Sequence, residues 1–126
     1  MRENTSTKEF ENIVSLFSLF CKNELKIKNL PTLHLIKSPR FAAKIAAFGE
    51  ISSHNRIVID IKDRQPMDIL RTVAHELVHY KQHESGKHGS GHAGSVTENE
   101  ANAKAGILMR KFGQTHAKIF KLPPVR

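Results

Sequence analysis

The chain has 126 residues, 39% hydrophobic and 25% charged, which fits one soluble globular domain over residues 1–126. No apolar run is long enough to cross a membrane, and the polar N-terminus lacks a secretory signal pattern, so we expect a cytoplasmic protein with no membrane partner. The single cysteine, Cys21, excludes an internal disulfide and a cysteine-rich zinc ribbon. A net charge of +8 without interleaved aromatic residues favours a solvated basic surface over a nucleic-acid partner.

An amphipathic helix is predicted for residues 6–23, because apolar residues recur there every three or four positions. Ser6 or Thr5 is suited to cap its start, and Glu9 stands where a capping box requires a glutamate. Cys21 ends the apolar run, so we expect a buried structural thiol. The polar face is not strongly basic, which favours packing within the domain over binding to a membrane surface.

A small sheet is predicted to follow. Residues 33–37 alternate as in a short strand, and residues 56–61 are rich in β-branched side chains. Alanines blur the period of residues 44–51, but the turn-like residues 52–55 favour a strand and a hairpin with 56–61. Pairing with 33–37 gives three or four strands, so the fold class is α+β.

The central helix is predicted over residues 66–85, a length of about 30 Å. Pro66 suits its first turn, Asp68 complements its dipole, and Gly86 is a natural stop. An apolar stripe along one face predicts packing against the rest of the domain. The stripe consists of Leu70, Val73, Ala74, Leu77 and Val78.

This helix carries the pattern His75-Glu76-Leu77-Val78-His79. Histidines four positions apart lie on one side of a helix, where both imidazoles can bind one zinc ion. Glu76 lies close enough to act as a general base on a water molecule. The histidines lie outside the apolar stripe, which favours metal binding over a core role.

A glycine-rich loop is predicted over residues 86–95 and a last long helix over 96–112, with Gly113 as its stop. A short helix is expected at 115–121, and Pro123-Pro124 is expected to end the ordered chain.

Catalytic zinc sites usually have three protein ligands. Alanines at 101, 103 and 105, with Gly106, would let the last helix approach the central one closely. Glu98 shares a face with the alanines at 101 and 105, whereas Glu100 matches Lys104 in a solvent-exposed i,i+4 pair. Glu98 is therefore favoured as the third ligand, with Glu100 as its alternative.

Two histidines of the glycine-rich loop, His88 and His92, compete for the third position. A metzincin would require a histidine six residues after His79, where Ser85 stands. A longer spacing occurs in SprT-like proteases, which keeps His92 as a weaker alternative.

Residues 68–82, together with Gly94-Ser95 and 98–106, resemble the small zinc metallopeptidase-like proteins encoded by tailed phages. The resemblance covers residues 56–113. It implies a minimal, gluzincin-like member of the zincin fold: an N-terminal helix, a small twisted sheet, the active-site helix and a Glu-bearing helix. It also implies residence in the host cytoplasm, or association with a virion.

The element Glu98-Asn99-Glu100-Ala101-Asn102 is similar to the Glu-x-x-Ala-Asn element of ImmA/IrrE-type metallopeptidases. There the Glu is the third zinc ligand, and it maps onto Glu98. The chain has Leu108-Met109-Arg110 where those proteins have Leu-Met-Pro, and it lacks their C-terminal domains. Their regulatory substrates therefore do not carry over.

These features predict a zinc metallopeptidase in which His75, His79 and Glu98 hold Zn²⁺ and Glu76 is the general base for hydrolysis of a peptide or protein substrate. A strand near residues 44–50 could align an extended peptide. The candidates for an oxyanion donor are Tyr80, His83, His88 and His92.

Two other functions remain open. A phage structural or assembly protein could use the zinc as a clasp, without need of a general base. A SprT-like DNA-associated protease would fit the basic charge, but such proteins often bind DNA through a Cys-rich ribbon, which one cysteine excludes. The sequence gives no signal for an oligomeric state.

Overall fold

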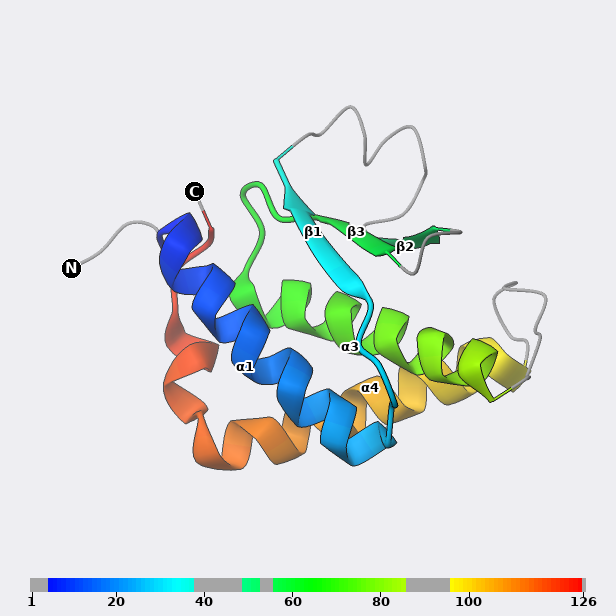
Figure 1. Cartoon of the computed structure of the whole chain (residues 1–126). Helices are drawn as coiled ribbons and strands as arrows, with labels where there is room; N and C mark the ends of the chain where they lie inside the picture. The colour runs from blue at the N-terminus through cyan, green and yellow to red at the C-terminus, as the bar shows by residue number, and fades with distance from the viewer. Residues whose placement is uncertain (1–4, 38–48, 53–55, 86–95, 126) are drawn as a thin grey trace.

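The computed structural model describes residues 5–37, 49–52, 56–85 and 96–125 (Figure 1). Its elements confirm the α+β class, with three long helices and a small sheet. In chain order they are α1 (Thr7–Leu25), β1 (Thr32–Ile36), β2 (Gly49–Ser52), β3 (Arg56–Asp60), α3 (Pro66–Glu84), α4 (Val96–Thr115) and the 3-10 helix η1 (Ala117–Lys121). Among the described residues, no helix is both long and apolar enough to span a membrane.

The sheet has the strand order β1-β3-β2. β3 pairs in parallel with β1, so that Leu33 lies opposite Ile57, and antiparallel with β2. The predicted hairpin and its pairing with the first strand are therefore confirmed. Residues 44–48 of the expected second strand lie outside the described part. Among the described strands, β2 thus lies at one edge of the sheet, next to β3.

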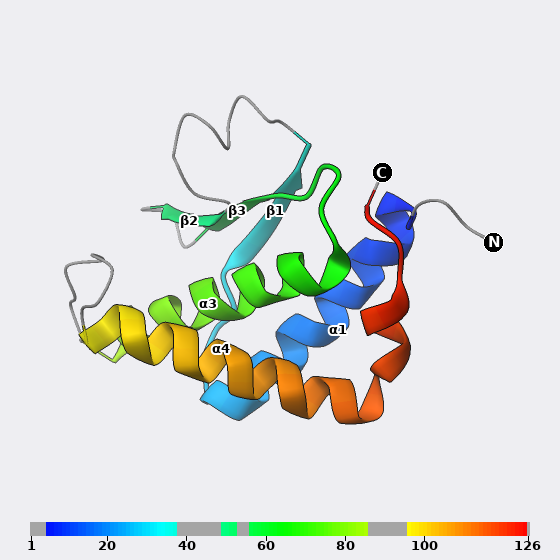
Figure 2. The ribbon, with the colours of Figure 1, turned by 180° about the vertical axis from the view of Figure 1, so that it is seen from behind.

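The helix α3 lies at the centre of the domain, between the sheet on one side and α1 and α4 on the others (Figures 1 and 2). Its predicted apolar stripe is at most 1% exposed. Each fully buried Leu or Val side chain contributes roughly 1.5–3 kcal/mol. The stripe therefore fixes the rotation of α3 about its axis, and with it the side on which the histidines lie. Gly86, which was predicted to end this helix, lies outside the described residues. The C-cap of α3 is Ser85.

The helix α1 begins as predicted, because the Ser6 side chain accepts a hydrogen bond from the Glu9 backbone N–H at 3.1 Å. It runs on to Leu25, and Lys26 ends it in the left-handed conformation with φ 58°. Cys21 is fully buried, and burial strongly raises the pKa of its thiol, as expected of a structural cysteine.

The prediction that Gly113 ends the last helix is wrong, since α4 continues through it to Thr115. Gly113 lies in ordinary helical backbone, and a Cβ at this position would overlap the far end of the Phe120 ring in η1, seven residues further along the chain. The absence of a side chain at Gly113 lets the Phe120 ring pack closely against α4, and Gly113 does not adopt a helix-ending conformation.

The prediction that order ends at Pro123-Pro124 is also wrong. Val125 is fully buried and forms a parallel bridge with Thr5. Its N–H donates to the Arg64 carbonyl at 2.8 Å, and its own carbonyl accepts from the Asp63 N–H at 3.0 Å. The C-terminal segment thereby joins the start of α1 to the turn before α3.

Candidate metal centre

The two histidines of α3 lie together on its polar side. Their ring centroids are 4.7 Å apart, and the Nε2 atoms of His75 and His79 are separated by 3.1 Å. A spacing of four residues brings both rings to one side of the helix, one turn apart. Both Nε2 atoms therefore face the same small volume.

A carboxylate from α4 completes this group. Oε1 of Glu98 lies 2.8 Å from His75 Nε2, and Oε2 lies 3.0 Å from His79 Nε2. One ligand atom from each of the three residues lies within 4.8 Å of the others, and the side chains are 17–19% exposed. The structure thus brings together the three residues predicted to hold the metal.

The packing of α4 against α3 allows the short Glu98 side chain to reach the histidines. Ala101 and Ala105 are at most 1% exposed and lie one and two turns after Glu98. By contrast, Ala103 is exposed, and a Cβ at Gly106 would meet nothing within 4 Å. Only two of the four small residues expected to promote close approach therefore do so.

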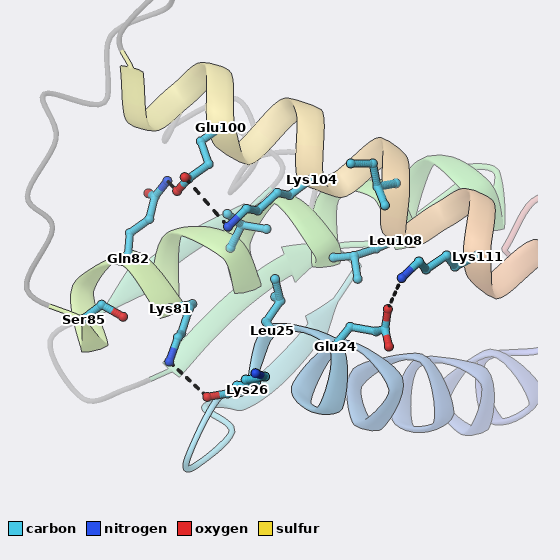
Figure 3. Close-up of a pocket in the computed structure, with 12 residues that line it drawn as sticks. Glu24, Leu25, Lys26, Lys81, Gln82, Ser85, Glu100, Lys104, Leu108 and Lys111 are labelled. Atoms are coloured by element: carbon cyan, nitrogen blue, oxygen red, sulfur yellow. Dashed lines mark hydrogen bonds and ion pairs between the residues drawn. The ribbon is translucent and has the colours of Figure 1, made fainter.

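Glu100 lies elsewhere. It forms the predicted ion pair with Lys104 at 3.8 Å, and it accepts a hydrogen bond from Gln82 Nε2 at 2.8 Å (Figure 3). It is not among the grouped ligand atoms. The rival candidates His88 and His92 lie outside the described residues.

Gln82 was missed by the sequence reasoning. Its side-chain oxygen lies 2.8 Å from Nδ1 of His79, and its Nε2 donates to the Thr97 carbonyl at 2.9 Å. The available signal was its position three residues after His79, which places it on the histidine side of the helix.

The surroundings of His75 favour its neutral form. Burial lowers the pKa of this imidazole below its ordinary value, and the nearby His79 acts in the same direction, while Glu98 and Asn102 oppose the shift. A neutral imidazole offers a nitrogen lone pair. Two imidazoles and one carboxylate form a donor set that suits zinc.

The remaining predicted residues within the described part of the chain belong to α3. Glu76 is half-buried and follows His75 directly on α3. Of the oxyanion candidates, Tyr80 is partly buried against the apolar core, while His83 is exposed. Tyr80 and His83 share with Glu76 the side of the helix next to the histidines, because they follow it by four and seven residues.

No family model, curated protein or solved structure matches the chain. Its function is therefore argued from the chemistry of this site.

Proposed function

We propose that the protein is a zinc-dependent metallopeptidase with a minimal zincin-like fold. The observation that carries the proposal is the meeting of His75, His79 and Glu98, with ligand atoms within 4.8 Å, beside a glutamate in the His-Glu-x-x-His pattern. Two helices supply these three residues, and all three are shielded from solvent without being fully buried.

The residues His75 and His79 would bind zinc through Nε2, and Glu98 would bind it through its carboxylate. Three protein ligands leave a coordination position for water or substrate, as in catalytic sites. When bound, zinc lowers the pKa of a water molecule to about 7 and polarises the carbonyl of a substrate.

Glu76 is the general base of the proposed reaction. The attacking water gives its proton to this carboxylate, which then delivers the proton to the leaving amide nitrogen. The role requires a carboxylate beside the ligands but not among them, and Glu76 follows His75 by about 100° around the axis of α3. A purely structural zinc site would have no need of it.

The strand β2 is proposed to guide the substrate. In the described part of the sheet it is an outer strand, and it contacts α3, the helix that carries the catalytic pattern. An extended peptide could add to such an edge through main-chain hydrogen bonds, which suits a peptide or protein substrate.

Replacing Glu76 with Gln tests the assignment. Zinc content should stay at about one ion per chain, while hydrolysis of a peptide library should fall by roughly 100-fold or more. Glu11→Gln, which removes a charge from an exposed position of α1, is the matched control and should leave hydrolysis unchanged. If the wild type binds zinc but cleaves nothing, the site is a structural clasp and the enzymatic proposal fails.

A further inference from the structure

Gln82 is a buried polar residue in the second half of α3, with only 4% of its surface exposed. Its amide makes three contacts with defined partners. The side-chain oxygen lies 2.8 Å from His79 Nδ1, and Nε2 donates to the Thr97 carbonyl at 2.9 Å and to Glu100 Oε1 at 2.8 Å. Figure 3 shows Gln82 of α3 directed at Glu100 of α4.

These partners determine which way the amide faces. The Thr97 carbonyl accepts hydrogen bonds and donates none, and so does the Glu100 carboxylate, which is paired with Lys104. The NH₂ group of Gln82 must therefore face them, because the opposite orientation would bring its oxygen against two acceptors. The oxygen of Gln82 is consequently left to face His79.

The orientation of the amide determines in turn which nitrogen of His79 carries a proton. An amide oxygen only accepts hydrogen bonds, so Nδ1 of His79 must donate to it. Nε2, the atom that faces His75 and Glu98, is then the nitrogen available to a metal.

We propose that Gln82 is the positioning residue of the metal centre. Its side-chain oxygen holds His79 with Nε2 toward the metal. Its side-chain NH₂ group binds the first turn of α4, which carries Glu98. This inference rests on the proposed zinc site and extends it to a residue that does not touch the metal. Thr97 directly precedes Glu98, so its bonded carbonyl restrains the backbone from which the third ligand projects.

The surroundings of Gln82 limit the useful substitutions. A cavity of about 400 Å³ between α1, α3 and α4 is lined by Gln82, Glu100 and Lys104, and by none of the three proposed ligands (Figure 3). A small side chain at position 82 would join this cavity to the metal centre. Gln82→Met and Gln82→Glu keep the length of the side chain and avoid this complication.

The two variants separate the contacts of the amide. Gln82→Met removes all of them. Gln82→Glu keeps an acceptor for His79 Nδ1 but loses the donor to Thr97 and places a negative charge next to Glu100. Glu100→Gln is the matched control, because it removes the charge while leaving an oxygen that can accept from Gln82.

The test measures zinc affinity by competition with a chromophoric chelator, in proteins shown by circular dichroism to be folded. Gln82→Met should bind zinc roughly 10- to 100-fold more weakly than the wild type, with Gln82→Glu between them and Glu100→Gln within about threefold of the wild type. NMR of the zinc-loaded proteins supplies a second readout. The His79 Nδ1 proton should exchange slowly with water in the wild type and rapidly in Gln82→Met.

Wild-type zinc affinity in Gln82→Met, with an equally protected Nδ1 proton, would overturn this inference and leave the proposed function intact. A wild type that binds no zinc would overturn both. If Gln82→Met does not fold, Gln82→Glu provides the test. Wild-type zinc affinity and a wild-type exchange rate of the His79 Nδ1 proton in this variant would contradict a role for the hydrogen bond to Thr97. A weaker zinc affinity would support that role.

Discussion

Oε1 of Glu98 lies 2.8 Å from Nε2 of His75, so a carboxylate of α4 contacts a histidine of α3 across the interface between the two helices. Neither helix holds the complete ligand set. A metal bound there would bridge the interface, and its binding free energy would add to the stability of the fold.

Zinc should therefore stabilise the protein against heat. At a free zinc concentration about 1,000 times the dissociation constant, the gain in the free energy of unfolding should be about 4 kcal/mol. Thermal denaturation followed by circular dichroism, with and without zinc, measures it. Glu98→Gln should lose most of the gain, and an undiminished gain in that variant would remove Glu98 from the ligand set.

The close contact of α4 with α3 predicts different effects for two similar substitutions. Ala101→Leu places a large side chain in a fully buried position, and overpacking of this kind typically costs about 1–3 kcal/mol. It should also weaken zinc binding, because it pushes Glu98 away from the histidines. Ala103→Leu, on the exposed side of α4, should change the free energy of unfolding by less than about 0.5 kcal/mol. Urea denaturation of both variants tests this, and equal effects would contradict the described packing.

The two described glycines of α4 should respond to alanine in opposite directions. At Gly113 a Cβ would overlap the Phe120 ring, so Gly113→Ala should lower the melting temperature. At Gly106 the space is open, and Gly106→Ala should raise stability by up to about 1 kcal/mol through helix propensity. Thermal melts of the two variants decide, and a stabilising Gly113→Ala would show that η1 packs differently.

The partly buried His75 should make the metal-free protein less stable in mild acid. Its pKa is lowered in the folded chain, chiefly by burial, and returns to its ordinary value of 6.5 on unfolding. Between these values the unfolded chain binds a proton that the folded chain does not, which favours unfolding. The contribution of neutral His75 to the free energy of unfolding is complete above the pKa of the unfolded chain. It is lost as the pH falls through the lowered pKa of the folded chain. Urea denaturation across this range should show a shallower decline for His75→Asn; identical pH profiles would contradict the assignment.

The sequence was sufficient to predict features that depend on the pattern within a single helix. The period of α3 predicted both its buried stripe and the common side of His75 and His79. The face of α4 favoured Glu98 over Glu100, and the structure places their side chains accordingly.

Contacts between distant segments could not be predicted in this way. Gln82 bonds to Thr97 and Glu100 on another helix, the Phe120 ring of η1 packs against Gly113, and Val125 forms hydrogen bonds with residues before α3. A local pattern shows that a residue is polar, small or apolar, but not which distant group it meets.

The central claim is that zinc held by His75, His79 and Glu98 supports hydrolysis with Glu76 as base. Zinc content and peptide cleavage should be measured on the same preparations of wild type, His75→Ala and Glu76→Gln. We predict zinc and cleavage in the wild type, neither in His75→Ala, and zinc without cleavage in Glu76→Gln. Full cleavage by Glu76→Gln, or a wild type that retains no zinc, would contradict the claim.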